Sequence, residues 1–460
     1  MNAIIEPALT GATALDHIAA FATNLRTARL PPAVVEKVKD CLLDALSACL
    51  TAGSSLEGVC AVTIGAAPPG VGVSTLIGTP LMGSPSGAAF VNATNAASTS
   101  RSDTHPASAS HPGPVVIAAV LALAEARRVS GATVIESIVS GYETMCRIGI
   151  ALVTPEFAAI FRPTGMIAPT AGAVAAARVL GLTTQQLRNA ASLATHTASG
   201  LNEWAHAGTS ELAFHSGFAA RNGVDAALLA QAGAVSAPTI VEGKSGLLAG
   251  YGALGRAPRL TERLGDEYKI LEIVHKPAPA CIYVQTACQC ARQLALDHRP
   301  DASAILSVEI KVSRAAATYP GCDDSGPIMN AQAAKLSIQF GVASVLVAGG
   351  IFDANWHDFK NTAANALTAR SKVIVDDNLT SALPGRHGTS IKLVLAGGME
   401  IEGRQDDFIP MSKHDLHQRF FSVAVPRLGS ARSERIVALV EELATLADIS
   451  ELTRLLRLPA

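Results

Sequence analysis

The sequence predicts an α plus α+β fold, with a large all-α domain and a smaller α+β domain. Ala-rich helical stretches separated by Gly or Pro dominate roughly the first 270 residues, the pattern of a helical domain. Alternating strand patterns follow, and the end of the chain is helical again. We therefore expect the large domain over residues 1–270 and the small domain over 271–408. Helices over 409–460 should then return to the large domain.

The expected helices are identified by their periodicity and by the residues that begin them. Residues 14–50 show helical periodicity, and Pro31 and Pro32 are placed to open a second helix. A short strand-like piece follows at residues 74–77. Thr183 and Thr184 precede two glutamines and form an N-terminal cap. The next apolar stretches predict helices over residues 113–129, 133–151, 165–180, 184–199 and 214–231.

The smaller domain is predicted from alternating side chains. Apolar residues at positions 306, 308, 310 and 312 alternate with polar ones, as in a half-buried strand, and Val373 and Val375 repeat the pattern. Residues 391–395 and 399–402 flank a glycine turn and predict a hairpin. We expect a helix over 331–347 between these strands. Helices should resume at residue 413 and end in an amphipathic region over 432–456.

Composition excludes several classes of function. The chain is 49% hydrophobic and 16% charged, with a net charge of −2 and no basic run, which argues against a nucleic-acid partner. Its apolar helices are broken by charge or shorter than a membrane span. Glu6 and Asp16 interrupt the N-terminus, so we expect no signal peptide and a cytoplasmic protein. Eight cysteines in 460 residues do not suggest a disulfide framework.

Cofactor and metal motifs are missing from the sequence. It contains no phosphate-binding loop, no GxGxxG after a strand and no GxSxG elbow. The Cys288-x-Cys290 pair lies in a helical stretch without a second pair, which disfavours a zinc site. His105 and His111 lack neighbouring Cys or Glu ligands. We expect neither a cofactor nor a metal.

The loop over residues 100–114 is the richest in groups that can move protons. It contains Ser100, Arg101, Asp103, His105 and His111, and a long apolar helix begins at its end. Acids and bases on a loop braced by a rigid helix suit acid–base catalysis. The alternative is a solvated turn with two surface histidines, and spacing alone does not separate the two.

Four further segments contain candidate functional groups. Arg162 comes just before a helix, a place where donors converge on an anion. Residues 203–211 form a polar interruption between two apolar helices. Residues 275–285 lie at the junction of the two expected domains, where clefts form. Residues 318–324 follow the first strand of the small domain. The alternatives are a surface charge at Arg162 and an ordinary inter-helix loop at 203–211.

A positive pocket would result if Arg101, His105, His111, Arg162 and Lys276 meet. Such a pocket suits a substrate with two or three carboxylates, because the guanidinium fork binds carboxylates bidentately. The same charges would stabilise the anion formed when a proton α to a carboxylate is removed. This chemistry requires a base, an acid and groups that hold an anion, without a redox cofactor.

Short motifs that recur along nearly the whole chain carry a resemblance to a known family. They are residues 90–93, 103–105, 111–112, 122–125, 140–143, 163–165, 208–209, 215–223, 242–243, 276–281, Pro327 and 334–337. In this order they resemble the MmgE/PrpD family, which includes 2-methylcitrate dehydratase, cis-aconitate decarboxylase and iminodisuccinate epimerase. The resemblance implies a large all-α domain, a smaller α+β lid domain, a homodimer and a cofactor-free site between the domains.

The chain also departs from the family pattern. Ser100 stands where the family usually has an acidic residue, and Arg101 and Ser102 replace other members of that run. Arg162 stands in place of a histidine, Leu212 in place of a lysine, with Glu211 beside it, and Gln285 in place of a histidine. The family's activities therefore cannot simply be transferred to this chain.

The retained residues define a candidate catalytic set. We expect His111 to act as base, Lys276 as acid or anion clamp, and Asp103 as a positioning carboxylate. Thr104 and His105 complete the catalytic candidates. The candidate substrate-binding residues are Ser100, Arg101, Arg162, Glu211, Tyr283 and Gln285.

By analogy with the family, we expect a cofactor-independent hydro-lyase acting on a small di- or tricarboxylate. An epimerase that uses the same carbanion is the second hypothesis, and a decarboxylase is the third. A relative that binds a carboxylate without catalysis is the hypothesis from another class. It is motivated by the changes at Ser100 and Arg162. Exchange of the α proton in heavy water would separate the enzymes from the binder.

Overall fold

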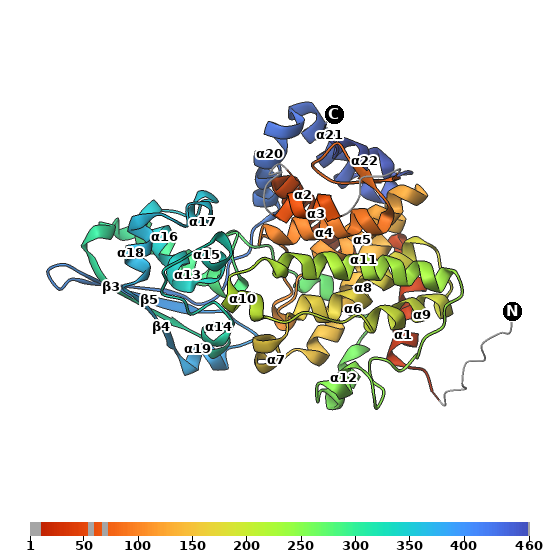
Figure 1. Ribbon diagram of the computed structural model, residues 1–460, viewed down its shortest axis with the longest axis horizontal. Coiled ribbons are helices and arrows are strands. Elements are labelled where there is room, and N and C mark those ends of the chain that lie inside the picture. Colours follow the sequence, from red (N-terminus) through yellow and green to blue (C-terminus); the bar gives the residue numbers. More distant parts are fainter. Residues whose placement is uncertain (1–10, 54–58, 67–71, 459–460) are drawn as a thin grey trace.

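Buried apolar side chains form two separate clusters in the computed structural model, which describes residues 11–53, 59–66 and 72–458. One cluster joins apolar residues between 15 and 273 with residues 420–456 of the C-terminal helices. The other is drawn mainly from residues 278–401. Figure 1 shows them as a larger helical body and a smaller body that contains a sheet. The fold is therefore mainly helical, with two small sheets. Glu6 lies outside the described residues.

The larger body is built around α8, Pro163–Val179, which is buried along almost its whole length. Its Ala and Gly side chains let neighbouring helices approach closely. Those that pack directly on it are α5 Pro112–Arg127, α6 Gly131–Leu152, α9 Thr184–Thr195 and α11 Glu211–Gln231. The other helices before residue 270 are α1 Ala14–Asn24, α2 Pro32–Gly53, α3 Val59–Ala66, α4 Pro85–Ser98, α7 Pro155–Ile160, α10 Glu203–Ala207 and α12 Leu247–Gly250.

Proline inside α8 is accommodated by a neighbouring loop. Pro169 has no N–H, so the carbonyl of Gly165 loses its usual helical partner. The N–H of Ser199 donates to that carbonyl at 3.3 Å. A Cβ on Gly165 would lie 2.3 Å from the Ser199 carbonyl oxygen, so only glycine allows this approach. The first turn of α8 is thereby fixed against the loop that follows α9.

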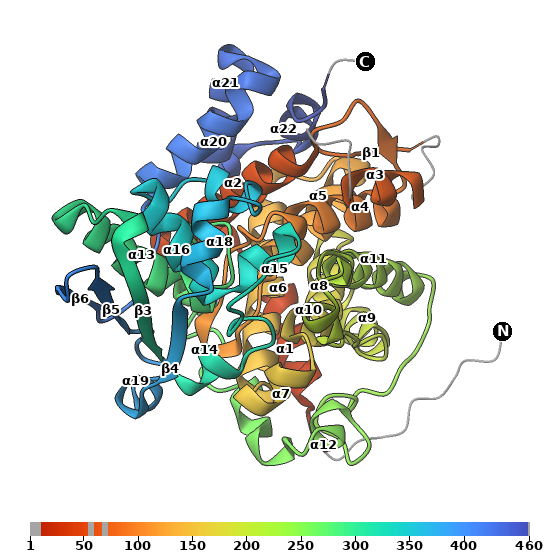
Figure 2. The same ribbon diagram turned by 60° about the vertical axis from the view of Figure 1, so that its left-hand side comes forward.

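The smaller body contains a four-stranded sheet in the order β4-β3-β5-β6. β3 Ile305–Val312 is parallel to β4 Ser371–Val375 and antiparallel to β5 Thr389–Leu395, which pairs with β6 Glu400–Gln405. Helices α13 Ile282–His298 and α16 Ile338–Ala348 pack together and against the sheet (Figure 2). The remaining elements here are α14 Arg314–Thr318, α15 Ala331–Leu336, α17 Ala354–His357, α18 Thr362–Thr368 and α19 Asp377–Ser381. A separate small hairpin joins β1 Ser74–Thr75 and β2 Met82–Gly83.

The C-terminal helices return to the larger body. α20 Lys413–Leu428 packs on α2, and the buried Arg419 of α20 pairs with Asp44 of α2. α21 Ser430–Glu441 also contacts α2, and α22 Ser450–Leu455 contacts α21 and α5 (Figures 1 and 2). Within the described part of the chain, no helix is both long and apolar enough to span a membrane.

Most of the expected elements are confirmed, including the cap at Thr183 and the glycine turn, where Gly397 and Gly398 have φ of 91° and 82°. Two expectations are corrected. The helix over 331–347 is two helices, because Ser337 leaves the helical conformation and caps α16. The predicted inward position of Leu306 is wrong: a shift in the β3–β5 register exposes Leu306 and buries Ile305. The expected helical region over 432–456 contains α21 and α22, and the polar stretch over 203–211 contains the short helix α10.

Candidate active site

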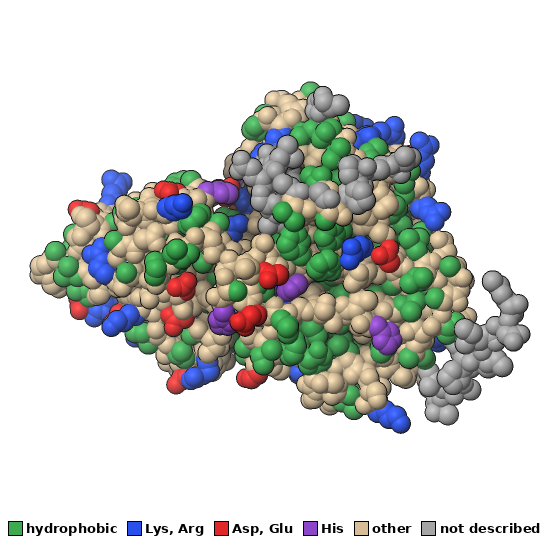
Figure 3. All heavy atoms as spheres, viewed as in Figure 1, with side chains coloured by type: hydrophobic (Ala, Val, Ile, Leu, Met, Phe, Trp, Pro, Cys, Tyr) green, Lys and Arg blue, Asp and Glu red, His purple; other side chains and the backbone are tan. Residues whose placement is uncertain are grey.

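A small cavity lies where the two bodies meet, with a volume of about 30 Å³. Four of the predicted site residues line it: Ser100, His111, Arg162 and Lys276. They come from positions far apart in the chain. Side chains from the smaller body, including Tyr319 and Lys335, complete the wall. In the space-filling view the two bodies meet at a notch along the upper edge of the molecule (Figure 3).

Ser100 begins the loop that follows α4. Its φ of 56° is left-handed, a conformation that a residue with a side chain rarely adopts outside functional loops and turns. The Nζ of Lys276 donates to the Ser100 carbonyl oxygen at 2.6 Å. The strained turn thus presents a backbone acceptor to the buried ammonium group.

His111 is held in one tautomer by the same loop. Its Nδ1 lies 2.9 Å from the Asp103 carbonyl oxygen and 3.1 Å from the Thr104 hydroxyl. A carbonyl oxygen can only accept, so Nδ1 carries the hydrogen, and in the neutral ring Nε2 is the basic nitrogen. Burial, with Lys276 and Arg162 nearby, holds the pKa of His111 well below its usual value. The imidazole is therefore neutral at physiological pH and available as a base.

Lys276 is buried and placed between two backbone carbonyls, those of Ser100 and, at 3.2 Å, Ala280. Burial lowers the pKa of its ammonium group from 10.5 to about 7. A lysine with this pKa can give up and regain a proton near neutral pH. Arg419 donates to the Lys276 carbonyl oxygen at 2.9 Å, which links this residue to the Asp44–Arg419 pair.

Arg162 immediately precedes α8 and is buried. Its guanidinium donates to the Tyr319 hydroxyl at 3.3 Å across the seam. Within the described part of the chain, its buried Nε has no hydrogen-bond partner. Leaving a buried charged donor unpaired is costly, so this atom suits an anion bound in the cavity.

Lys335 and Gln332 are wall residues to which the sequence analysis assigned no role, although Lys335 lies in a quoted family motif. Lys335, on α15 of the smaller body, donates to the Ser98 carbonyl oxygen at 3.0 Å. Burial, with Arg101 nearby, lowers the pKa of Lys335 to about 8. Asn330 caps the start of α15, and this cap in the sequence could have drawn attention to Lys335 on the same short helix. The smaller body thus adds a third cation to the cavity.

Cys281 and Tyr319 also line the cavity, although no role was expected for either from the sequence. Tyr319 pairs its ring with that of Tyr283 at 5.4 Å. Cys281 precedes α13, five residues after Lys276. Cys281 could have been recognised from the sequence as a reactive cysteine, because it comes just before a helix and lies close to Lys276.

Asp103, Thr104 and His105 lie behind the cavity wall. The Asp103 carboxylate accepts from the Gly113 N–H at 2.8 Å and from the Tyr142 hydroxyl at 2.6 Å, and burial raises its pKa. Thr104 contacts the His111 ring. His105 is fully buried, 3.0 Å from Glu272, whose pKa falls to about 2 mainly through this hydrogen bond. The structure therefore places these three residues where they support the loop.

The other four predicted binding residues do not line the cavity. Gln285 is buried, and its side-chain amide forms hydrogen bonds with the backbone of residues 278–281. The ring of Tyr283 packs against the ring of Tyr319 and does not itself line the cavity. Glu211 is exposed at the start of α11, while its neighbour Leu212 reaches the wall. The buried Arg101 pairs with Asp353 of the smaller body, and burial lowers its pKa to about 10.

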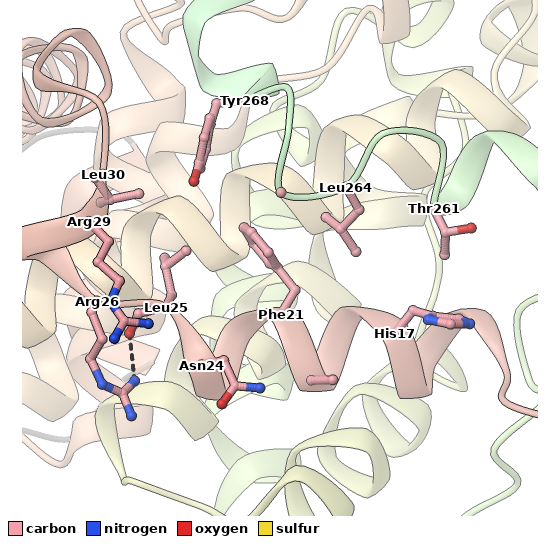
Figure 4. A pocket seen from close by; sticks show the side chains of 12 residues that line it. His17, Phe21, Asn24, Leu25, Arg26, Arg29, Leu30, Thr261, Leu264 and Tyr268 are labelled. Carbon is pink, nitrogen blue, oxygen red and sulfur yellow. Dashed lines mark hydrogen bonds between the residues drawn. The ribbon is translucent and has the colours of Figure 1, made fainter.

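A larger hollow of about 470 Å³ lies elsewhere, between α1 and residues 261–268 (Figure 4). Phe21 and Tyr268 form its apolar part, with ring centroids 6.4 Å apart. The Arg26 guanidinium donates to the carbonyl oxygens of Thr23 and Leu25, at 2.8 and 2.6 Å. His17, Arg29 and Tyr268 also line this hollow, but none of the site residues expected from the sequence does.

The arrangement at the seam supports three chemical tasks. The His111 imidazole can take a proton, the Lys276 ammonium can give one, and Arg162 with Lys335 can hold carboxylates. No group of three or more His, Cys, Asp or Glu side chains suited to a metal ion occurs among the described residues. Fold and cavity together define a two-body protein with a cationic acid–base site at the seam.

Comparison with known proteins identifies the family. Residues 16–256 match the MmgE/PrpD N-terminal domain and residues 278–445 match the MmgE/PrpD C-terminal domain, so the chain belongs to the MmgE/PrpD family. It is similar to human cis-aconitate decarboxylase, with 27% identity over 82% of this chain and 80% of that protein. It is also 26% identical to cis-aconitate decarboxylase of Aspergillus terreus, over 96% of each chain.

Proposed function

We propose that this protein is a cofactor-independent lyase that acts on a small di- or tricarboxylate by removing a proton α to a carboxylate. One observation carries the proposal: a neutral imidazole with a fixed tautomer, His111, shares a cavity with Lys276 and Arg162. A base alone would not suffice, because the carbanion it forms must be stabilised. The surrounding cations supply that stabilisation in a site largely closed to water.

In the proposed dehydration, Nε2 of His111 takes the α proton and the electron pair is held as an enediolate against Lys276 and Arg162. The pair then forms the carbon–carbon double bond as the β-hydroxyl leaves. Lys276 gives that hydroxyl its proton, so water departs and an unsaturated carboxylate remains. His111 returns its proton to solvent and Lys276 regains one. Its pKa of about 7 suits both the donation and the recovery.

The substrate class follows from the charges that line the cavity. Arg162 comes from the larger body and Lys335 from the smaller one, with Lys276 at the junction. Each can pair with a carboxylate, and the present 30 Å³ would hold only about two water molecules. We therefore propose that the smaller body, residues 271–408, is a lid that moves to admit a substrate with two or three carboxylates. The Arg101–Asp353 pair joins the two bodies and would break or rearrange in that motion.

Decarboxylation is the second candidate, and the relatives favour it. The similar human and Aspergillus terreus proteins are cis-aconitate decarboxylases. In that reaction a carboxylate leaves as carbon dioxide and the carbanion takes a proton from Lys276. The same cavity could serve both reactions. They differ in how the carbanion forms: by loss of a proton to His111 in the dehydration, and by loss of carbon dioxide in the decarboxylation.

The test is a screen of di- and tricarboxylates by thermal shift, followed by nuclear magnetic resonance of each binder in heavy water. The dehydratase is expected to exchange the α proton and release an unsaturated acid, without carbon dioxide. Release of carbon dioxide would establish the decarboxylase in its place. Exchange with loss of configuration and no loss of water would indicate an epimerase. Thermal stabilisation without exchange or product would reject the lyase and leave a carboxylate binder.

A further inference from the structure

Two cysteines face one another at the wall of the cavity. The Sγ of Cys281, which lines it, lies 4.0 Å from the Sγ of Cys322. Cys281 precedes α13, and Cys322 lies in the loop that follows α14 and carries Tyr319. The proposed lyase mechanism uses neither thiol. No disulfide joins them in the structure.

Cys281 is surrounded by groups that stabilise a thiolate. It sits at the N-terminus of a 17-residue helix, where the backbone N–H groups favour negative charge. Lys276 and Arg162 lie nearby, and the Cys322 thiol donates to the Cys281 sulfur. These contacts, the last being the largest, lower the pKa of Cys281 to about 7. A substantial fraction of Cys281 is therefore the nucleophilic thiolate at neutral pH.

Cys322 is placed to resolve an oxidised Cys281. It is fully buried, its pKa is raised well above the ordinary value through its hydrogen bond to Cys281, and it keeps its proton. Disulfide formation requires the two sulfurs to approach by about 2 Å, since an S–S bond is about 2 Å long. The neighbouring Gly321 has a φ of 78°, a left-handed conformation that glycine adopts without strain.

Cys281 borders the cavity, whose 30 Å³ exceeds the about 10–15 Å³ that one water molecule requires. A molecule close to water in size, such as hydrogen peroxide, can therefore occupy the space beside the Cys281 sulfur.

We propose that Cys281 and Cys322 form a peroxide-sensitive thiol pair that is oxidised to a disulfide at the wall of the cavity. The Cys281 thiolate attacks a peroxide oxygen, the O–O bond breaks, and a sulfenic acid forms with release of water once a proton is taken up. Cys322 then attacks the sulfenic sulfur and a second water leaves. Two thiols and one hydrogen peroxide thus give one disulfide and two water molecules. A dithiol reverses the change.

The disulfide alters the site in two ways. It removes the thiolate beside Lys276, and it ties residues 319–322 to the start of α13. Tyr319 belongs to that segment and accepts a hydrogen bond from Arg162. Oxidation should therefore disturb the anion-holding side of the cavity.

The test treats the full chain with about one equivalent of hydrogen peroxide and maps the peptides by mass spectrometry. A Cys281–Cys322 disulfide is expected in the wild type, with reversal by a dithiol. In Cys322→Ser, a sulfenic acid at Cys281 should be trapped by a dimedone probe. In Cys281→Ser, Cys322 should stay reduced. Cys288, buried on α13 with a pKa raised by burial, is the internal control and should stay reduced throughout.

Oxidation of Cys288 as fast as that of Cys281, or oxidation of Cys281 to its sulfinic acid without disulfide in the wild type, would overturn the proposal. This measurement needs no substrate. Its failure would therefore leave the proposed lyase intact, and failure of the lyase would leave the thiol pair intact. Once a substrate is known, the disulfide form should show at least a tenfold lower turnover that a dithiol restores.

Discussion

The Nδ1 atom of His111 donates to the carbonyl oxygen of Asp103, eight residues earlier in the same loop, over 2.9 Å. The loop folds on itself, so that one residue fixes the tautomer of the other. The Asp103 carboxylate is in turn held by Gly113, in the first turn of α5. The loop thus sets the tautomer of the proposed base, while Thr164 of α8 accepts from the His111 N–H and Tyr142 of α6 donates to the Asp103 carboxylate.

Replacement of His111 by Asn should reduce turnover by about 10²–10⁴-fold, the usual contribution of a general base. The amide can still donate to the Asp103 carbonyl but has no basic nitrogen. Steady-state kinetics on the substrate found by the screen gives the measurement. His196→Asn, on an exposed histidine at the end of α9, is the matched control and should keep wild-type turnover. If both variants turn over normally, His111 is not the base.

Replacement of Gly113 by Ala should weaken both the fold and the site. A Cβ at this position would lie 2.6 Å from Oδ1 of Asp103, which must move. We expect a loss of about 1–3 kcal/mol in the free energy of unfolding, as for other overpacked sites, and reduced turnover as His111 loses its orientation. Urea denaturation measures the first effect. Gly250→Ala, where nothing lies within 4 Å of the added Cβ, should be within about 0.5 kcal/mol of wild type.

Much of the architecture could be predicted because it depends on local patterns. Helix periodicity located α5, α6, α8 and α11 to within a few residues, and the glycine pair located the hairpin turn. The meeting of His111, Arg162 and Lys276 was expected from their residue types and the family resemblance. A charged residue next to a predicted helix start, such as Arg162, can therefore be recognised from the sequence as a candidate site residue.

The remaining features depend on tertiary contacts that no local pattern contains. The exposure of Leu306 follows from a register shift against β5, which alternation in β3 alone cannot reveal. Gln285 looked like a binding group, yet the backbone of residues 278–281 takes its amide. Lys335 reaches the cavity only because the smaller body packs against the end of α4. In each case a distant segment decides what the side chain contacts.

Replacement of Lys335 by Met should raise KM by about 10–100-fold with a smaller effect on kcat. A charged hydrogen bond to a substrate carboxylate is worth about 1.5–3 kcal/mol. Michaelis–Menten analysis separates the two constants. Lys372→Met, on an exposed lysine of β4, is the control and should leave KM unchanged. An equal fall in kcat with unchanged KM would instead place Lys335 in the chemical step.

The free energy of unfolding should increase as the pH rises from 7 to 9, because the buried Lys276 loses its proton in the folded protein before it does in the unfolded chain. Its pKa is about 7 in the folded protein and about 10.5 when the chain unfolds, because burial disfavours the charged form. Between these values the unfolded chain holds a proton that the folded chain lacks. Raising the pH removes that advantage of the unfolded state.

The expected gain from Lys276 is about 2 kcal/mol in the free energy of unfolding between pH 7 and 9. Urea denaturation of Cys281→Ser and of the double variant that combines Cys281→Ser with Lys276→Met, at both pH values, isolates this contribution. Lys335 titrates in the same range in both proteins, and Cys281, whose pKa depends on Lys276, is replaced by Ser in both, so only the difference between the two slopes counts. The slope should be smaller in the double variant by about that amount. Equal slopes would mean that Lys276 keeps its ordinary pKa in the folded protein, and its role as a proton donor near neutral pH would then fail as well.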